Sequence, residues 1–226
     1  GIWKANSNGD DIKVYKSLDG SDLKGTFHFL RQQQPNNKTS YCLSDFVAPE
    51  YTGKNDYLGG FAVTIGDQVE SYAKTFEDKG DDYSSILIKA LGDRLAEAFA
   101  ELMHKKMRSI FYPNKQEDLS LNDLIKERYT GIRPAHGYPA CPDHTEKNFL
   151  WSLLDVENKI GISLTTSFAM NPPSSVSGLY FFNSQAKYFN VGLISQDQIK
   201  HYSARKNISV KETEKWLSSN LGYITD

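Results

Sequence analysis

The clearest regular pattern of apolar positions lies between Asp82 and about Arg108. Apolar side chains recur there at steps of three and four residues, which is the period of one face of an α-helix. They are Ile86, Leu87, Ala90, Leu91, Leu95, Ala98, Phe99, Leu102 and Met103. The pattern predicts one long helix, with Glu97 as a carboxylate within its apolar stripe.

Start and stop signals predict four shorter helices. Residues 120–123 read Ser-Leu-Asn-Asp, a cap-like signature for a helix that leads directly into Gly131. Asp143 or Thr145 is expected to start the next helix, which ends near Gly161. Two further helices are expected after residue 194, the second with a Ser cap followed by Glu three positions later.

Short apolar runs bounded by turn residues predict the strands of a sheet. The predicted strands are residues 13–15, 25–30, 59–65, 164–169, 178–182 and 188–194, and the start of the chain is also strand-like. The first two flank a turn at residues 19–21 and form a hairpin, whereas the polar segment 32–38 is expected to be a loop. Strands and helices without a regular βαβ repeat are typical of an α+β domain. We expect a mainly antiparallel, twisted sheet flanked by helices.

Composition excludes several classes of function. The chain of 226 residues can bury a substantial core, and we expect residues 1–226 to form one domain. Its 26 basic and 28 acidic residues are interspersed and give a formal net charge of −2, which argues against nucleic acid as a partner. No apolar run approaches a membrane span or a signal peptide, so we predict a cytoplasmic protein without a membrane partner. Two cysteines are expected to stay reduced.

Ligand-type side chains are crowded into the segment 131–147, much of which cannot be helical. Three prolines stiffen the backbone from Arg133 onward, so little entropy is lost when a ligand binds. Gly137 lets a ligand approach the backbone, Arg133 can donate two parallel hydrogen bonds to a carboxylate or phosphate, and Tyr138 adds an aromatic face. The segment is therefore predicted to be a binding loop.

The amino-acid sequence of this loop closely resembles a known motif. From Arg133 it reads Arg-Pro-Ala-x-Gly-Tyr-Pro-Ala-Cys-Pro-Asp-His-Thr-Glu-Lys, which is similar to the S-adenosylmethionine-binding motif in the activation domain of cobalamin-dependent methionine synthase. Further blocks of resemblance cover nearly the whole chain in the family's order. They are residues 9–12, 41–49, 93–101, 167–170, 175–178 and 220–223. The family's fold is also α+β.

The resemblance implies roles for four residues of the loop. Arg133 is expected to hold the methionyl carboxylate of S-adenosylmethionine. Ala135 and Gly137 are expected to offer backbone contacts, with Tyr138 packing or hydrogen bonding beside them. His136 stands where the family often carries another proline, a departure that reduces the stiffness of the loop.

Residues outside the loop complete the implied site. Glu97 and Glu127 are expected to lie around the ligand, where carboxylates attract a sulfonium. Tyr188 and Phe189 match two adjacent aromatic positions of the family, and strand alternation would send their rings to opposite faces. Asp93 lies one turn before Glu97 and is expected either to be solvated or to face a docking partner. In the family, a further acidic residue upstream of this chain's first residue contacts the methionyl ammonium.

The function implied by the resemblance is reactivation of methionine synthase. The domain would bind S-adenosylmethionine and present its methyl group to cob(I)alamin, which one-electron reduction of inactive cob(II)alamin generates. Cobalamin would be bound by a neighbouring module, zinc only by other modules, and the electron would come from flavodoxin or an equivalent donor. The chain would supply positioning rather than catalytic residues. As an isolated fragment of a multidomain methyltransferase, it is not expected to form methionine.

Two alternatives remain open from the sequence. The same fold could serve as a ligand-free regulatory or interaction module, which the start of the chain and Phe189 both favour. Cys141 and His144 could instead form a nucleophile and base in a hydrolase, or part of a metal site. Neither arrangement is specific, because the remaining histidines are scattered and a metal usually requires three or four ligands.

Overall fold

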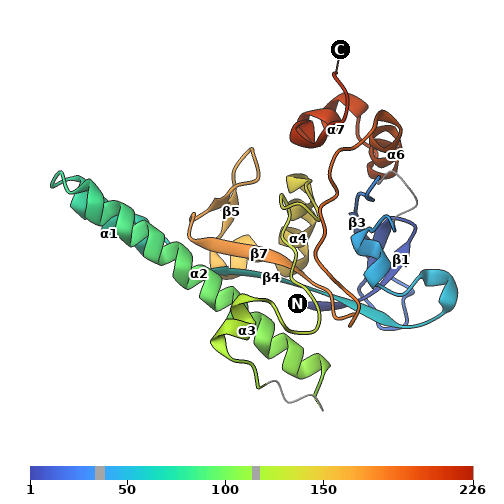
Figure 1. The fold of residues 1–226 in the computed structure, drawn as a ribbon, viewed down its shortest axis with the longest axis horizontal. Coiled ribbons are helices and arrows are strands. Elements are labelled where there is room, and N and C mark those ends of the chain that lie inside the picture. Colours follow the sequence, from blue (N-terminus) through green and yellow to red (C-terminus); the bar gives the residue numbers. More distant parts are fainter. Residues whose placement is uncertain (34–38, 114–117, 226) are drawn as a thin grey trace.

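A five-stranded antiparallel sheet forms the centre of the computed structural model, which describes residues 1–33, 39–113 and 118–225 (Figure 1). The strand order is β3-β2-β1-β4-β7, and a separate two-stranded ladder joins β5 and β6. The strands are β1 (Ile2–Asn8), β2 (Asp11–Tyr15), β3 (Leu23–His28), β4 (Asp56–Thr64), β5 (Ser163–Leu164), β6 (Met170–Asn171) and β7 (Ser175–Tyr180). The predicted α+β class and the predicted β2–β3 hairpin are confirmed.

Local signals place most of the helices correctly. Ser120 and Ser209 each accept a hydrogen bond from the backbone N–H three residues later, as a cap should. Asp143 caps a 3-10 turn that leads into α4, but the single helix expected there is broken at Asp155, which has a φ of 56°. The helices are α1 (Gln68–Glu77), α2 (Asp82–Phe111), α3 (Leu121–Ile125), α4 (Lys147–Leu154), α5 (Val156–Ile160), α6 (Gln196–Lys206) and α7 (Val210–Trp216).

The two faces of the sheet are covered by different helices. Because side chains alternate along a strand, Leu179 of β7 faces the main core, where α4 contributes Leu150 and Trp151. Its neighbour Tyr180 faces the other side and packs with Phe61 of β4 against α2. A third apolar cluster lies under α6 and α7, at the upper right of Figure 1.

The long helix α2 is present as predicted, but most of its large apolar side chains are exposed, whereas Met103 and Met107 pack against the cluster of Phe61 and Tyr180. The residues that it buries are small or polar and are spaced mostly four apart: Ser85, Gly92, Ala96, Ala100, His104 and Arg108. This seam lets α1 and the sheet approach closely, since a Cβ on Gly92 would lie 2.8 Å from Val69. The apolar stripe therefore forms an exposed surface, called here the α2 ridge: Leu87, Leu91, Leu95, Phe99 and Leu102.

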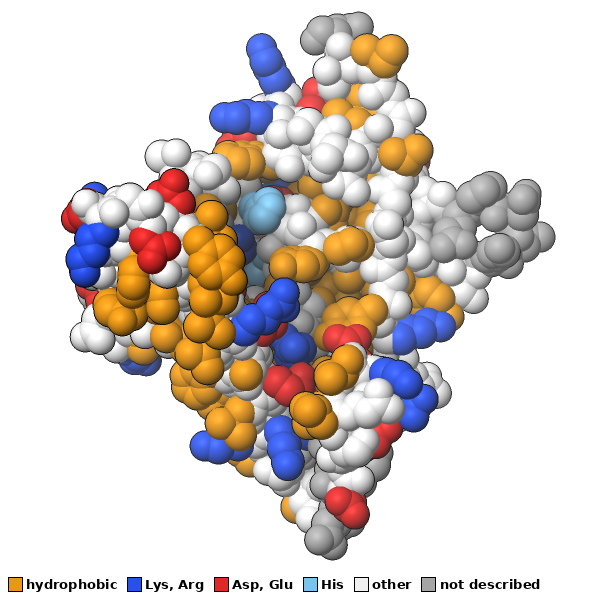
Figure 2. All heavy atoms as spheres, turned by 60° about the vertical axis from the view of Figure 1, so that its left-hand side comes forward, with side chains coloured by type: hydrophobic (Ala, Val, Ile, Leu, Met, Phe, Trp, Pro, Cys, Tyr) orange, Lys and Arg blue, Asp and Glu red, His pale blue; other side chains and the backbone are white. Residues whose placement is uncertain are grey.

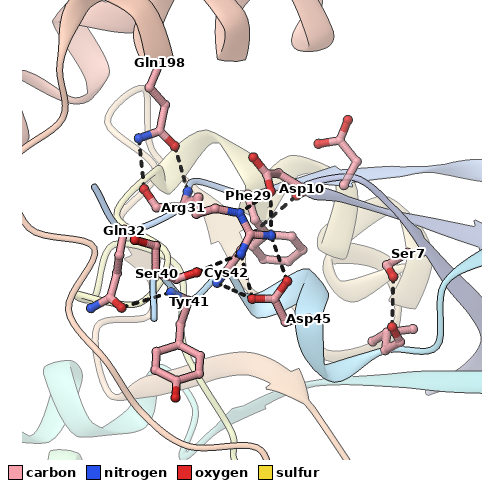
Figure 3. Close-up of polar contacts among 12 residues, drawn as sticks. Ser7, Asp10, Phe29, Arg31, Gln32, Ser40, Tyr41, Cys42, Asp45 and Gln198 are labelled. Carbon is pink, nitrogen blue, oxygen red and sulfur yellow. Dashed lines mark hydrogen bonds and ion pairs between the residues drawn. The ribbon is translucent and has the colours of Figure 1, made fainter. Parts of the chain in front are cut away.

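A polar network joins sequence blocks that lie far apart (Figure 3). Arg31, just after β3, donates through Nε to Asp10 at 2.8 Å and through both terminal nitrogens to Asp45 at 2.8 and 2.7 Å. The side chain of Gln198 on α6 pairs with both the N–H and the C=O of Arg31. Two of the blocks that resemble the family are thus held against each other, and α6 is fixed to them.

Two predicted strands are wrong. Only Leu164 of the segment 164–169 belongs to a strand, because Thr165 and Ala169 close a turn instead. Residues 188–194 form no strand either, since the N–H of Val191 bonds to Pro139 of the binding loop rather than to a sheet. Within the predicted loop at 32–38, residues 34–38 lie outside the described residues. None of the helices described is long and apolar enough to cross a membrane.

Candidate ligand-binding site

The binding loop continues the edge of the sheet beside β7. Ile132 and Phe181 exchange two backbone hydrogen bonds of 3.1 and 3.0 Å, and the N–H of Leu179 donates to Pro134 at 2.9 Å. Gly178 is required here, because a Cβ would stand 2.7 Å from the carbonyl oxygen of Pro134. The loop backbone is therefore fixed by the sheet as well as by its prolines.

Beyond Pro134 the loop closes a tight turn. The N–H of Gly137 donates to Cys141 at 2.8 Å, and the N–H of Tyr138 donates to Ala135 at 3.2 Å. Gly137 has a φ of 92°, a conformation that favours glycine. The thiol of Cys141 donates inward to the Ala135 carbonyl at 3.0 Å. This turn leaves Tyr138 exposed at the rim of a cavity.

The cavity has a volume of about 600 Å³ and is lined largely by apolar atoms with a few convergent polar groups, as ligand sites usually are. Figure 2 shows a hollow on the face of the molecule that carries the α2 ridge. Acidic, basic and histidine side chains gather in this hollow, beside the ridge. Seven of the eight residues that the sequence predicted line the cavity: Glu97, Glu127, Arg133, Ala135, Tyr138, Tyr188 and Phe189. The eighth, Gly137, is not among the lining residues.

Arg133 is held among carboxylates on one side of the cavity. Its guanidinium lies 3.7 Å from Glu97 and 3.4 Å from Glu101, and its side chain is only 17% exposed. Glu101 also pairs with Arg108, at 3.5 Å, so its negative charge neutralises Arg133 only in part. The Arg133 guanidinium can therefore still attract another anion. No described residue accepts a hydrogen bond from the buried Nε of Arg133. The guanidinium can therefore bind a carboxylate without giving up its position.

Glu127 gives the same side of the cavity an acidic group. It follows α3 with a φ of 50°, and burial raises the pKa of its carboxyl, with Glu101 acting in the same direction and Arg133 opposing. A carboxylate that is partly buried near another carboxylate gains from a nearby cation. The region around Arg133 can therefore accept a ligand that carries both charges.

Tyr188 and Phe189 lie together on the cavity wall, contrary to the alternation expected for a strand. In this irregular segment the Tyr188 hydroxyl accepts a hydrogen bond from the backbone N–H of Arg133 at 3.0 Å. Burial raises the pKa of Tyr188 to about 12. Phe189 also packs against Tyr41 and Phe46, with ring centroids 6.1 and 6.4 Å apart. Both aromatic residues contribute, one through its hydroxyl and one through apolar area.

Several residues of the site were not identified from the sequence. Glu101 pairs with Arg133 without lining the cavity itself, and it lies one helical turn after Glu97 on the same face, a spacing that could have indicated it. His136, His144 and Lys147 line the cavity, although no local pattern distinguishes them from structural residues. Asp93 is outside the cavity lining and accepts a hydrogen bond from Ser174.

The hydrolase and metal alternatives lack the necessary geometry. Burial raises the pKa of the Cys141 thiol well above its usual value, and the thiol donates to Ala135 rather than to an imidazole. It is therefore not an activated nucleophile. His144 contacts Lys147 instead, with 3.1 Å between Nδ1 and Nζ. Among the described residues, no group of three or more His, Cys, Asp or Glu is placed to hold a metal ion.

The fold and the cavity together define an α+β ligand-binding domain whose site suits a zwitterion. Residues 1–207 match the family model described as the activation domain of vitamin B12-dependent methionine synthase. A crystal structure of the MetH reactivation domain bound to AdoHcy is 50% identical in sequence, with a TM-score of 0.95. The alignment covers 99% of this chain and 70% of that chain. The chain belongs to the family of methionine synthase activation domains, and the resemblance inferred from sequence is confirmed.

Proposed function

We propose that this domain binds S-adenosylmethionine in the cavity beside the binding loop and presents its methyl group during reactivation of methionine synthase. The observation that carries the proposal is that Arg133, its ion-pair partner Glu97 and the acidic Glu127 all line one largely apolar cavity. A methionyl carboxylate fits the guanidinium, and the carboxylates attract the ammonium and sulfonium. The AdoHcy bound to the similar MetH domain supports this choice of ligand.

The contribution of this chain is binding and orientation. The sulfonium is already a good leaving group, so no general acid or base is needed, and fixing the methyl group in line with its acceptor is the main task. A reduced cobalamin held by a neighbouring module supplies the nucleophile when it is bound. Transfer of the methyl group leaves the neutral thioether S-adenosylhomocysteine in the cavity.

The α2 ridge is suited to docking the neighbouring cobalamin module. It is a row of large exposed apolar side chains, and large apolar patches on a soluble domain mark interaction sites. It also lies beside the cavity (Figure 2), which Glu97 of the same helix lines. A module seated on the ridge would therefore stand next to the bound methyl group. Flavodoxin or an equivalent donor would supply the electron, and residues 1–226 would act as one domain of a methyltransferase.

The proposal is tested by calorimetry of S-adenosylmethionine binding to the 226-residue chain. Arg133→Ala should weaken binding by about tenfold or more, because charge-assisted hydrogen bonds to the ligand carboxylate are lost. Arg128→Ala is the matched control, since Arg128 is exposed and pairs with Asp123 outside the cavity. Absence of binding by the native chain, or equal affinities for all three proteins, would contradict the proposal and favour a ligand-free interaction module.

A further inference from the structure

A second polar group lines the cavity away from Arg133. It consists of His136, His144 and Lys147, and no hydrogen bond or ion pair between described residues connects it to the carboxylates around Arg133. Lys147 is buried, and within the described part of the chain no carboxylate lies in ion-pair range of it. A buried ammonium needs other partners, and these decide what the group can do.

Lys147 fixes the proton of His144. Its Nζ donates to the Phe168 carbonyl at 2.8 Å and lies 3.1 Å from Nδ1 of His144. An ammonium has donors but no acceptor, so Nδ1 of His144 must accept and the ring proton must be on Nε2. Burial lowers the pKa of His144, with the charge of Lys147 acting in the same direction, so the ring is neutral at pH 7.

Gly137 fixes the position of the same ring. A Cβ at residue 137 would lie 1.9 Å from Cε1 of His144 and 2.4 Å from each ring nitrogen. The edge of the imidazole thus occupies the space that the missing side chain leaves. Gly137 therefore makes room for a side chain that lines the cavity, and its backbone contact with the ligand stays a prediction. Within the described residues, Nε2 of His144 has no hydrogen-bond acceptor.

His136 also lines the cavity, and its ring nitrogens have no hydrogen-bond partner among the described residues. The side chain of His136 is 1% exposed. It stacks on Phe27 with the ring centroids 5.8 Å apart. Buried polar groups are normally satisfied, so this part of the cavity is suited to a ligand with several neutral polar atoms. The carboxylate and sulfonium are better placed near Arg133, Glu97 and Glu127.

We propose that His144 is a specificity-determining residue that donates a hydrogen bond from Nε2 to a neutral acceptor on the adenosine group of the ligand. This inference rests on the proposed function, because it assigns the adenosine end of the same ligand. The acceptor is either a ring nitrogen of adenine or a ribose hydroxyl. Lys147 and Gly137 are positioning residues, because they act through the imidazole.

Calorimetry with S-adenosylhomocysteine tests this assignment on the 226-residue chain. His144→Phe keeps a ring but removes the donor, and binding should weaken by about three- to tenfold. His144→Gln keeps an N–H donor near the position of Nε2 and should bind more tightly than His144→Phe. Lys147→Met no longer fixes the ring proton of His144 on Nε2. The loss of affinity in this variant should lie between those of the native chain and His144→Phe. His201→Phe is the control, because His201 is exposed on α6. Thermal melting of each variant verifies folding.

Ligand analogues identify the acceptor. Binding of the 3-deaza, 7-deaza and 2′-deoxy forms of S-adenosylhomocysteine is measured with the native chain and with His144→Phe. If the native chain and His144→Phe bind one analogue with the same affinity, that analogue lacks the atom that His144 contacts. Equal binding of the normal ligand to native and His144→Phe protein, while Arg133→Ala still weakens it, would overturn this inference and leave the proposed function standing. No binding to the native chain would remove both.

Discussion

Arg133 and Glu127 show how single residues divide the work of the site. The Arg133 guanidinium can hold a carboxylate in two parallel hydrogen bonds, whereas Glu127 provides negative charge next to it. The carboxylates attract the sulfonium of S-adenosylmethionine but not the neutral thioether of S-adenosylhomocysteine. The affinities of the two ligands should therefore differ mainly through this charge interaction.

Glu127→Gln should separate these two ligands. Affinity for S-adenosylmethionine should fall by about fivefold, since a charge interaction with the sulfonium is lost, whereas affinity for S-adenosylhomocysteine should change by less than about twofold. The ratio of the two dissociation constants, measured by calorimetry on the same preparation, provides an internal control. An equal loss for both ligands would show that Glu127 acts on the shape of the site and not on its charge.

His136 should make the domain sensitive to acid. Burial lowers the pKa of His136 to about 3, against an ordinary value of 6.5. The folded form therefore binds no proton in the range where the unfolded chain does. Stability is fully present above pH 6.5 and is lost as the pH falls from 6.5 toward 3. For this one residue the loss between pH 7 and pH 5 is about 2 kcal/mol.

His136→Leu should remove this part of the acid sensitivity. The free energy of unfolding is measured with urea at pH 7 and at pH 5 for both proteins. The decrease between the two pH values should be about 2 kcal/mol smaller in His136→Leu than in the native chain. Part of the dependence should remain, because burial also lowers the pKa of His104 to about 3. His201→Asn, an exposed substitution, should leave the native dependence unchanged. The same pH dependence in His136→Leu and native protein would contradict this account.

At the scale of elements, α2 has two opposite faces with different tasks. One face, made of small residues together with His104 and Arg108, packs against α1 and the sheet, while the α2 ridge remains exposed. A helix normally buries its large apolar side chains. The exposed ridge supports the proposed docking of a partner, and its position beside the cavity would connect docking with ligand presentation.

Leu95→Asp should impair docking and leave ligand binding intact. Leu95 is 56% exposed, so the substitution should not disturb folding, but a buried carboxylate at the interface would be costly. In the complete enzyme, the rate of reactivation by S-adenosylmethionine should fall by about tenfold or more, with an unchanged dissociation constant for the ligand. Leu18→Asp, at a leucine in the β2–β3 turn that is 74% exposed, is the control. Unimpaired reactivation would exclude Leu95 from the docking surface.

At the scale of the whole molecule, α6 and α7 are integrated with the sheet through buried charge. Lys206 on α6 pairs with Asp143 at 2.7 Å and also with Glu146, both of which are buried at the start of α4. Lys206 thereby offsets the effect of burial and lowers the pKa of Asp143, together with hydrogen bonds from neighbouring groups. Removal of the cation would leave these two buried carboxylates without their charge partner.

Truncation after residue 194 should therefore destabilise the entire domain. Breaking a buried ion pair costs about 3–5 kcal/mol, which corresponds to a decrease in melting temperature of about 10 °C or more for a chain of this size. A chain ending at residue 207 retains α6 and Lys206 and should lose less stability, because only the packing of α7 is removed. Circular dichroism melting compares the three proteins. Equal melting temperatures would show that the C-terminal helices are an independent unit.

Features encoded over a few residues could be predicted from the sequence. The helical period of α2, the caps at Ser120 and Ser209, and the stiff loop from Arg133 all follow from local backbone preferences. Seven of the eight predicted site residues line one cavity, because the motif keeps the loop and its neighbours in a common arrangement.

Only the tertiary structure decided which partner each of these segments has. Residues 188–194 contain strand-forming side chains, yet the backbone of Val191 bonds to the binding loop, so no strand forms. Glu101 and Lys147 became part of the site through packing between segments far apart in the chain. The apolar period of α2 determined a helix but not its buried face, because small residues allow a closer approach to the sheet than leucines do. Local preferences act within one segment, whereas burial and charge pairing depend on what the completed fold brings next to it.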